Sequence, residues 1–470
     1  MSQVSEISLF AKRKKIYQKR VWGKYRKIKW LILMCTLGIY YLCPWIRWDR
    51  GINAPDQAIL IDMLNRRAYF FFIDIWPQEV YFLVGILIFC ALLLFLFTSL
   101  LGRVWCGYCC PQTVWTDLFI WVERIFQGDR NTRMRRDKFP YNFSTIWRKS
   151  FTHIVWLLIS LITGGAWVFY FNDAPTLFDQ IINFDVPRTV LGWVLALTFS
   201  TYFMAGFARE QVCTYVCPYS RFQSAMFDKD TLIVNYDTKR GEPRGKHKQG
   251  DSWIGRGHCI DCSACVQVCH MGIDIRNGLQ MECIACSLCI DACNNVMNKL
   301  NLPKGLIHYS THNQIGSSIK GNNTINIWRP RTFYYITILS IIAIIILYGF
   351  ITRPLLELHV LHDRNPLFVT MSDGTIRNGY DIKILNKTYE DKKYTLVVSG
   401  IENTEIEIKG PGNIEADDLS VFANSVAHFR VFAFAKRTEL SRRKITFFIQ
   451  EHNASFFDVS ESIFISDRNK

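Results

Sequence analysis

The 470-residue sequence lacks the patterns that bind several common redox cofactors. No glycine-rich dinucleotide fingerprint opens a strand–helix unit, and no P-loop pattern is present. The long apolar runs contain one histidine, His153 at the edge of a run, which argues against a haem held by two histidines. Any electrons that the protein handles must therefore come from a partner protein, a small reductant or a quinol.

Cysteine is absent from the C-terminal part of the chain. All sixteen cysteines lie at or before Cys293. This distribution does not indicate a protein stabilised by disulfide bonds. A reducing compartment such as the cytoplasm keeps these thiols available as metal ligands.

Eight cysteines form one phrase, C-x2-C-x2-C-x3-C, written twice between Cys259 and Cys293. This is the spacing of bacterial ferredoxins, in which three close thiolates hold one [4Fe-4S] cluster and the fourth reaches over to the other. Two clusters and one-electron transfer follow. The expected ligands of cluster one are Cys259, Cys262, Cys265 and Cys293, and those of cluster two are Cys283, Cys286, Cys289 and Cys269.

Zinc sites or disulfides are the alternative for these cysteines, because zinc is also held by C-x2-C pairs. A zinc site does not need the third cysteine two residues further on, which favours the clusters. Proline usually follows the fourth cysteine of each phrase, whereas His270 and Asn294 occupy those places here. Since proline is no ligand, we expect both clusters to form, with altered loops and potentials.

Five apolar runs are long enough to cross a hydrocarbon core of about 30 Å. They are Trp30–Ile46, Val80–Leu101, Thr152–Phe171, Arg188–Phe207 and Thr332–Ile351. A buried core helix is the alternative for the first run, which Pro44 interrupts. Ten basic residues from Lys12 to Lys29 precede it and no small-residue cleavage site follows, so we expect this span to stay as an anchor.

Charge in the connecting segments predicts the orientation, because cytoplasmic loops are rich in Lys and Arg. The N-terminal tail carries ten basic residues and the loop from Gly102 to Phe151 carries nine. The segment from Asn172 to Pro187 carries none. These counts predict a cytoplasmic N-terminus and an exported C-terminal part. The net charge of +15 then reflects topology and contact with lipid headgroups, and no motif indicates binding to nucleic acid.

A second repeat, C-x-Y-x-C-P, follows the second and fourth runs, with Cys106 and Cys110 in one copy and Cys213 and Cys217 in the other. Cysteines at i and i+4 share one face of a helical turn, and the following proline bends the chain. We expect the four thiols to converge near the cytoplasmic face, where soft thiolates select Cu(I), Zn or an iron-sulfur cluster. Ordinary buried cysteine is the alternative, and Cys109 has no counterpart.

From Thr352 to Lys470 the sequence becomes rich in short β-type runs. We predict one antiparallel sandwich, which acts as a docking domain or simply as a stability module. His359 and His362 are candidate copper ligands, with solvated surface histidines as the alternative. The predicted strands are Asp381–Leu385, Tyr394–Val398, Glu405–Lys409, His428–Ala435, Ile445–Gln450 and Ser462–Ser466.

Together these motifs resemble the CcoG/FixG/RdxA family of cbb3-type cytochrome c oxidase accessory proteins. The resemblance is carried by Arg103–Tyr108, by Cys110–Trp115, by Tyr215–Gln223, and by the double ferredoxin phrase with Gly272–Arg276. It implies a bacterial inner-membrane polyferredoxin with an Ig-like C-terminal domain that reduces Cu(II) to Cu(I) for the oxidase copper site. It also implies that Cys106, Cys110, Cys213 and Cys217 are the copper or redox positions.

The expected fold is therefore a mixed membrane protein with five transmembrane helices, a cytoplasmic 2[4Fe-4S] ferredoxin domain and a periplasmic all-β Ig-like sandwich. The expected divisions are a basic tail (1–29), a four-helix membrane domain (30–207), a cytoplasmic segment (208–330) with the ferredoxin domain at about 250–300, a fifth helix (331–351) and the periplasmic domain (352–470). The expected partners are oxidase assembly factors or copper carriers, an electron donor and membrane lipid. Self-association is left open.

Two other functions fit the same motifs. One is a subunit that oxidises quinol and delivers electrons to a different terminal enzyme, although a large exported β domain would then be surplus. The other is an assembly scaffold whose clusters only hold the fold.

Overall fold

The computed structural model describes residues 15–51, 53–247, 252–314, 328–409, 416, 418–436, 441–452 and 457–466. Residues 1–14 of the predicted basic tail lie outside this range. The chain divides into two compact units. One comprises Met1–Ile46 and Ala58–Ile346, and the other comprises Arg47–Gln57 and Leu347–Lys470.

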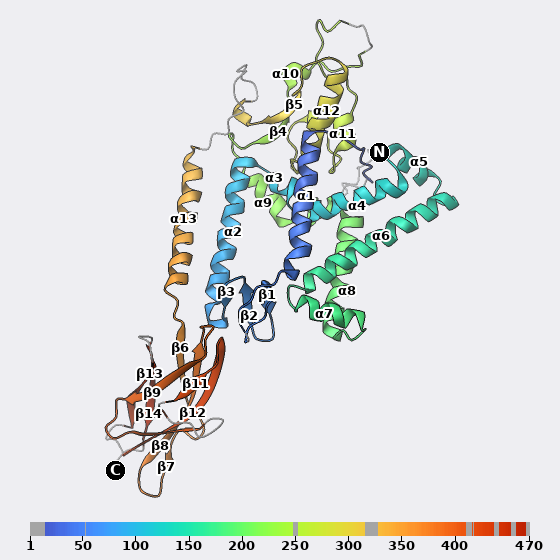
Figure 1. The fold of residues 1–470 in the computed structure, drawn as a ribbon. Helices are drawn as coiled ribbons and strands as arrows, with labels where there is room; N and C mark the ends of the chain where they lie inside the picture. The colour runs from blue at the N-terminus through green and yellow to red at the C-terminus, as the bar shows by residue number, and fades with distance from the viewer. Residues whose placement is uncertain are drawn as a thin grey trace, which may run out of the picture. The chain divides into compact units, whose positions relative to one another are not determined.

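Within the described residues, five helical segments are long and apolar enough to cross a membrane, and each matches a predicted run (Figure 1). The first begins at Lys24 rather than Trp30, because Arg26 and Lys29 are buried on the helix instead of lying in a solvated tail. The segments are Lys24–Trp45 (α1, Lys24–Leu42, with η1, Cys43–Trp45), Pro77–Leu101 (η2, Pro77–Glu79, with α2, Val80–Leu101), Phe143–Val168 (α6), Arg188–Ala208 (α8, Arg188–Phe203, with the π-helical η3, Met204–Ala208) and Pro330–Ile351 (α13).

The segment between α2 and α6, predicted as a basic loop, is instead largely helical. It contains α3 (Val104–Tyr108), α4 (Pro111–Gln127) and α5 (Arg130–Lys138). Pro111 starts α4 because the first helical position needs no backbone donor. The ring of Phe119 on α4 is fully buried and stacks on Trp156 of α6 at 5.2 Å, which anchors α4 against the apolar helices.

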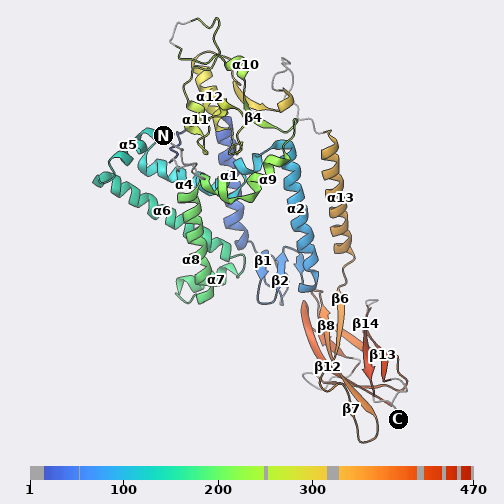
Figure 2. The same cartoon turned by 180° about the vertical axis from the view of Figure 1, so that it is seen from behind.

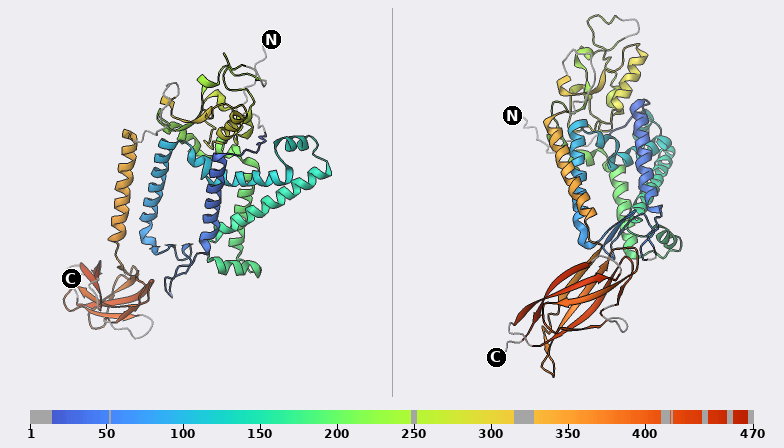
Figure 3. Two further views of the ribbon diagram at one scale, coloured as in Figure 1. Left: turned by 45° about the horizontal axis from the view of Figure 1, so that its top comes forward. Right: turned by 60° about the vertical axis from the view of Figure 1, so that its left-hand side comes forward.

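The cysteine-rich segment packs at the N-terminal end of α1 (Figures 1 and 3). Gly23 offers no capping side chain to α1, and the carboxylate of Asp291 on α12 accepts the N–H groups of Tyr25 and Arg26 instead, at 3.3 and 2.8 Å. The elements of this segment are η4 (Val212–Val216, π-helical), α9 (Pro218–Met226), β4 (Ile233–Tyr236), α10 (Thr238–Gly241), α11 (Ala264–Val268), η5 (Ile275–Asn277), α12 (Leu288–Lys299), β5 (Ile307–Ser310) and η6 (His312–Gln314).

A small antiparallel sheet that the sequence did not predict lies at the opposite end of α1 and α2 (Figure 2). Its strands follow one another in order, and Tyr69 in the middle strand is buried. They are β1 (Ile59–Asp62), β2 (Arg67–Phe70) and β3 (Ile73–Ile75), and α7 (Ala174–Ile182) connects α6 to α8.

The second unit contains an antiparallel sandwich of two sheets. One sheet has the order β10-β12-β8-β6 with β7 on β8, and the other has the order β11-β9-β13-β14. The strands are β6 (Leu356–His362), β7 (Val369–Thr370), β8 (Ile376–Asn386), β9 (Lys392–Ser399), β10 (Glu405–Lys409), β11 (Leu419–Val421), β12 (Ser425–Ala435), β13 (Arg442–Glu451) and β14 (Phe457–Ile465). All six predicted strands are present, and β6, β7 and β11 are additional.

Alternation along the strands builds the core of the sandwich. Tyr380, Ile382 and Ile384 on β8 are fully buried, as are Ile445 and Phe447 on β13. These two strands belong to different sheets, and the rings of Tyr380 and Phe447 meet between them at 4.9 Å. The residues between them on each strand face outward, which is the pattern of two sheets that share one apolar layer.

Candidate metal centres

The structure gathers the eight ferredoxin-type cysteines around two neighbouring pockets. One pocket is lined by Cys259, Cys262, Cys265 and Cys293 together with apolar side chains of α12 and β5. The other is lined by Cys269, Cys283, Cys286 and Cys289. Cys265 lines both pockets. Each pocket thus combines three cysteines of one phrase with the last cysteine of the other, which is the arrangement that crossed ligation requires.

The two loops that carry these cysteines have the same unusual backbone. Asp261 and Ser263 in the first phrase have positive φ angles of 52° and 53°, and Ala285 and Ser287 at the same places in the second have 52° and 60°. Non-glycine residues adopt this conformation at a cost of roughly 1–3 kcal/mol, so its repetition indicates a shared purpose. Such turns direct successive N–H groups toward one point, which suits a negatively charged group.

Burial favours the protonated form of four of these thiols until a metal displaces the proton. It raises the pKa of Cys265 and Cys283 to about 11, and that of Cys269 and Cys293 to about 12. Metal ligation requires the thiolate, so binding of iron and release of protons are coupled here. The all-cysteine donor sets and the apolar walls therefore fit [4Fe-4S] clusters, whereas the identity of each ligand stays a prediction.

The two C-x-Y-x-C-P motifs share a backbone that differs from the predicted one. Cys106 lies within α3, but Cys110 lies outside it as the residue before Pro111 at the start of α4. Cys213 lies within η4, and Cys217 precedes Pro218 at the start of α9. The predicted common helical face is therefore wrong, because each proline starts a new helix.

A π-type turn joins the two cysteines of each motif. The N–H group of Cys110 donates to the carbonyl of Trp105 at 3.0 Å, and that of Cys217 donates to Val212 at 2.8 Å, both five residues back. Such turns occur frequently at functional sites.

The structure brings the four edge thiols, those of Cys106, Cys110, Cys213 and Cys217, into one neighbourhood. Burial raises the pKa of Cys106 to about 11 and that of Cys213 to about 12, and the charges of the other edge thiols add to both shifts. Within the described residues, no three His, Cys, Asp or Glu side chains are arranged to hold a single metal ion. Binding one ion by these thiols would thus require side-chain movement.

The first edge motif touches the loop of the second pocket. Gly107 packs so closely that a Cβ atom there would lie 2.6 Å from the carbonyl oxygen of Ile284 and 3.0 Å from the Cα of Cys286. The thiol of Cys106 donates to Oε1 of Gln223 on α9 at 3.4 Å. Cys106 and Cys286 also share one buried apolar cluster. The first edge motif is therefore in direct contact with the loop that carries Cys286.

Arg103 ties the same parts together. Its guanidinium donates to the carbonyl oxygen of Cys283 in the second phrase, to that of Met281 just before this phrase, and to that of Ser220 on α9. Burial lowers the pKa of Arg103, and the neighbouring thiols of Cys106 and Cys283 oppose that shift. Arg103 thus holds the second pocket and both edge motifs in one arrangement.

Family models of known proteins match the segments that carry the two cysteine motifs and the sandwich. Residues 208–312 match the model of a "4Fe-4S dicluster domain", and residues 83–130 match that of a "4Fe-4S binding domain". Residues 346–467 match an "IG-like fold at C-terminal of FixG". "Nitrogen fixation protein FixG" of Rhizobium meliloti (strain 1021) is 45% identical over 455 residues, which cover 90% of this chain and 87% of that protein.

The chain belongs to the FixG/RdxA family. "Protein RdxB" and "Protein RdxA" of Cereibacter sphaeroides are 47% and 46% identical to it over 434 and 431 residues, and each alignment covers 91% of this chain and 90% of the relative. The predicted family is thus confirmed. This FixG/RdxA-family chain is an iron-sulfur electron-transfer protein with two [4Fe-4S] clusters.

His270, which replaces the expected proline in this FixG/RdxA-family chain, lies in a buried polar network. Its Nε2 lies 3.2 Å from Oδ1 of Asp117 on α4 and 3.5 Å from Nζ of Lys29 on α1. Its Nδ1 lies 4.0 Å from Sγ of Cys286. Asn294, at the equivalent place, accepts the N–H of Gly305 at 2.9 Å.

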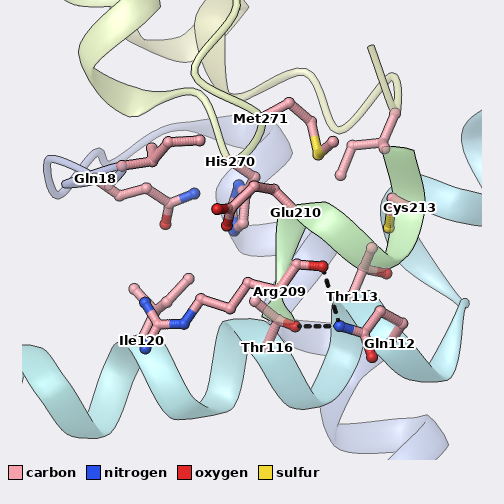
Figure 4. Close-up of a pocket in the computed structure, with 12 residues that line it drawn as sticks. Gln18, Gln112, Thr113, Thr116, Ile120, Arg209, Glu210, Cys213, His270 and Met271 are labelled. Carbon is pink, nitrogen blue, oxygen red and sulfur yellow. Dashed lines mark hydrogen bonds between the residues drawn. The ribbon is translucent and has the colours of Figure 1, made fainter. Parts of the chain in front are cut away.

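A pocket beside this network joins the second edge motif to the cluster segment (Figure 4). Arg209, Glu210 and Cys213 approach it from one side, and His270 and Met271 approach it from the other. The arginine that follows α8 is fixed by a buried ion pair, with Nη2 of Arg209 2.6 Å from Oε1 of Glu123. His270 thus lies between the second pocket and the second edge motif.

Sequence reasoning did not identify Asp117, Gln223 or Tyr309 as site residues. Tyr309 on β5 donates to the carbonyl of Ala285 at 2.9 Å and accepts from the hydroxyl of Ser287, both in the second cysteine phrase. Asp117 had one possible signal, since it is one of two carboxylates, with Glu123, on the otherwise largely apolar α4.

The two histidines predicted as candidate copper ligands both lie on β6. Nε2 of His359 lies 3.4 Å from Oε2 of Glu357, and Nε2 of His362 lies 2.8 Å from Oδ1 of Asn378. They are three positions apart on one strand, so their side chains point to opposite faces, and they bind different partners. Copper binding by His359 and His362 is not supported by any further described residue near them.

Proposed function

We propose that this FixG/RdxA-family protein reduces Cu(II) to Cu(I) for assembly of a cbb3-type cytochrome c oxidase. When bound, the two [4Fe-4S] clusters supply one-electron transfer. Cu(II) takes up one electron and leaves as Cu(I), and soft thiolates favour that product. Cys106, Cys110, Cys213 and Cys217 are proposed to receive the copper, with Cys259, Cys262, Cys265 and Cys293 holding cluster one and Cys283, Cys286, Cys289 and Cys269 holding cluster two.

The contact of Gly107 with Ile284 and Cys286 is the observation that carries this proposal. It supports short-range electron transfer between the second pocket and the four edge thiols. The thiols of Cys106 and Cys213 have raised pKa values, so they lose their protons when a metal binds and then act as soft thiolate ligands. Arg103 holds the carbonyl groups of both partners and limits their relative movement.

We also propose that the N-terminus and the cysteine-rich segment face the cytoplasm and that the sandwich faces the periplasm of a bacterial inner membrane. The basic tail and the basic α5 support this orientation, because positive charge gathers on the cytoplasmic side. The sandwich is proposed to dock an oxidase assembly factor or a copper carrier.

The test is anaerobic. The purified protein is reduced, freed of excess reductant and mixed with Cu(II), while cluster absorbance and a Cu(I)-specific chelator are followed together. Stoichiometric reoxidation with formation of Cu(I) is expected. The double variant Cys213→Ser with Cys217→Ser should lose most of this reaction and keep its clusters. Cys35→Ser with Cys90→Ser, two exposed cysteines of the apolar helices, is the control.

Reduced clusters that persist while no Cu(I) forms would instead favour the quinol-linked or scaffold function. A second candidate for the edge thiols is an additional iron-sulfur cluster, since residues 83–130, which contain Cys106 and Cys110, match a 4Fe-4S binding model. Iron analysis separates the two. About eight iron atoms per chain fit two clusters and copper at the edge, whereas about twelve would fit a third cluster.

A further inference from the structure

His270 connects a buried ion pair to a cysteine of the second pocket. The imidazole is 8% exposed, with Nε2 facing Lys29 and Asp117 and Nδ1 facing Sγ of Cys286 at 4.0 Å. Proline, which follows the fourth cysteine in the bacterial ferredoxin pattern, has no side-chain donor for such a contact.

The ion pair is unusual in having two cations for one carboxylate. Arg26 donates from Nη1 to Oδ1 and Oδ2 of Asp117, at 2.9 and 2.8 Å. Nζ of Lys29, which is 1% exposed, lies 3.8 Å from Oδ2 and closer, at 3.5 Å, to Nε2 of His270. A third cation here would be unfavourable, so the imidazole is neutral and carries one proton.

The chemistry of the cysteine decides where that proton lies. A sulfur that ligates iron has no proton and can only accept, so Nδ1 and Sγ of Cys286 attract each other only if Nδ1 carries the hydrogen. Nε2 is then bare and accepts from the ammonium of Lys29, which needs an acceptor because it is buried. This choice leaves no proton between Nε2 and Oδ1 of Asp117, which lie 3.2 Å apart. The ammonium of Lys29, 3.5 Å from Nε2 and 3.8 Å from Oδ2 of Asp117, supplies the positive charge that offsets the repulsion between these two acceptors.

We propose that His270 donates a hydrogen bond from Nδ1 to Sγ of Cys286 and thereby raises the reduction potential of the second cluster. Lys29 is the positioning residue that fixes the tautomer. The inference rests on the proposed assignment of Cys286 to this cluster. A reduced cluster carries one more negative charge, so donors to its sulfurs and nearby buried cations stabilise it relative to the oxidised state.

The first pocket has no such donor at the equivalent place. Asn294 follows Cys293 as His270 follows Cys269, but its side chain binds the N–H of Gly305. The hydrogen bond therefore acts on one cluster. That cluster lies next to Gly107 and the first edge motif. A raised potential therefore favours the presence of the electron on the cluster nearer to the thiols that are proposed to bind copper.

The test is a redox titration of the purified full chain, monitored by EPR. In His270→Leu and Lys29→Met one of the two midpoint potentials should fall, which changes the distribution of an electron between the clusters by roughly tenfold. The other potential should not move. Lys27→Met is the matched control, since Lys27 is exposed on the same helix. His270→Gln, which keeps a donor, should restore part of the shift.

A labelling experiment needs no substitution and decides the matter where a variant does not assemble its clusters. Histidine labelled with 15N at Nδ1 should give a pulsed-EPR coupling to one reduced cluster. Absence of that coupling, or potentials unchanged in His270→Leu with intact clusters, would overturn the inference. Neither readout uses copper, so failure of copper reduction leaves this test unaffected.

Discussion

Gly107 lies directly against the backbone of Cys286. A methyl group on Gly107 would be 3.0 Å from both the amide nitrogen and the Cα of Cys286, and 2.6 Å from the carbonyl oxygen of Ile284. These neighbours are backbone atoms, which cannot turn aside as a flexible side chain can. Only glycine fits at this position of the first edge motif, where the motif contacts the loop of the second pocket.

Gly107→Ala is therefore expected to separate the edge thiols from the second pocket. Overpacking of this kind lowers the free energy of unfolding by roughly 1–3 kcal/mol. Displacement of reacting groups should slow copper reduction on the order of tenfold or more while both clusters are retained. The measurement is the single-turnover rate of Cu(I) formation. Gly165→Ala on α6, where the added methyl meets nothing within 4 Å, is the control and should react normally.

Arg103→Lys should weaken the second pocket selectively. A lysine cannot reproduce the fork that serves the carbonyl oxygens of Met281, Cys283 and Ser220, and buried acceptors without donors cost about 1–3 kcal/mol each. We expect faster loss of cluster absorbance in the presence of an iron chelator. Arg135→Lys, an exposed position on α5, should decay like the unsubstituted protein. Equal rates of cluster loss in the unsubstituted protein and in both variants would refute this role of Arg103.

Copper affinity should rise with pH. Because the pKa of Cys106 is raised to about 11 and that of Cys213 to about 12, both thiols are protonated at neutral pH and must each lose a proton to bind Cu(I). The apparent association constant should increase about tenfold per pH unit for each thiol that is deprotonated, throughout the range below these pKa values. Competition titrations between pH 6 and 8 measure the slope, and a flat profile would exclude these thiols as ligands.

Phe447→Ala tests the role of the sandwich. Its ring is fully buried between the sheets, so the substitution should cost about 3–5 kcal/mol and expose the domain to protease. The core of the sandwich is separate from that around the cysteines, so cluster content and copper reduction should persist. Loss of oxidase assembly alone would support docking. Phe448→Ala, at a position that is 38% exposed, should have a much smaller effect on protease resistance.

Local patterns in the sequence predicted much of the fold. The five apolar runs and six of the strands were found because their signals, length and alternation, lie within a few consecutive residues. Strands β7 and β11 are too short to show an alternation of apolar and polar residues. Helix α4 was predicted as a loop because Arg124 and Glu123 interrupt its apolar residues.

The polar network could not be predicted, because its members are distant in the sequence. Arg26 and Lys29 read as part of a basic tail until Asp117 is brought against them by the packing of α1 on α4. The cysteine spacing predicted which thiols share a pocket, but it carries no information on which residues pack against each cysteine loop. The effect of replacing proline by His270 depends on those surroundings.

The exchange of the last cysteine between the two phrases also sets an order for biosynthesis. The pocket whose phrase begins first is completed last, because it needs Cys293, whereas the neighbouring pocket has all its cysteines once Cys289 has been added. A ribosome must therefore deliver both phrases before the earlier pocket can be filled. A chain truncated between Cys289 and Cys293 would carry all the cysteines of one pocket and lack one cysteine of the other.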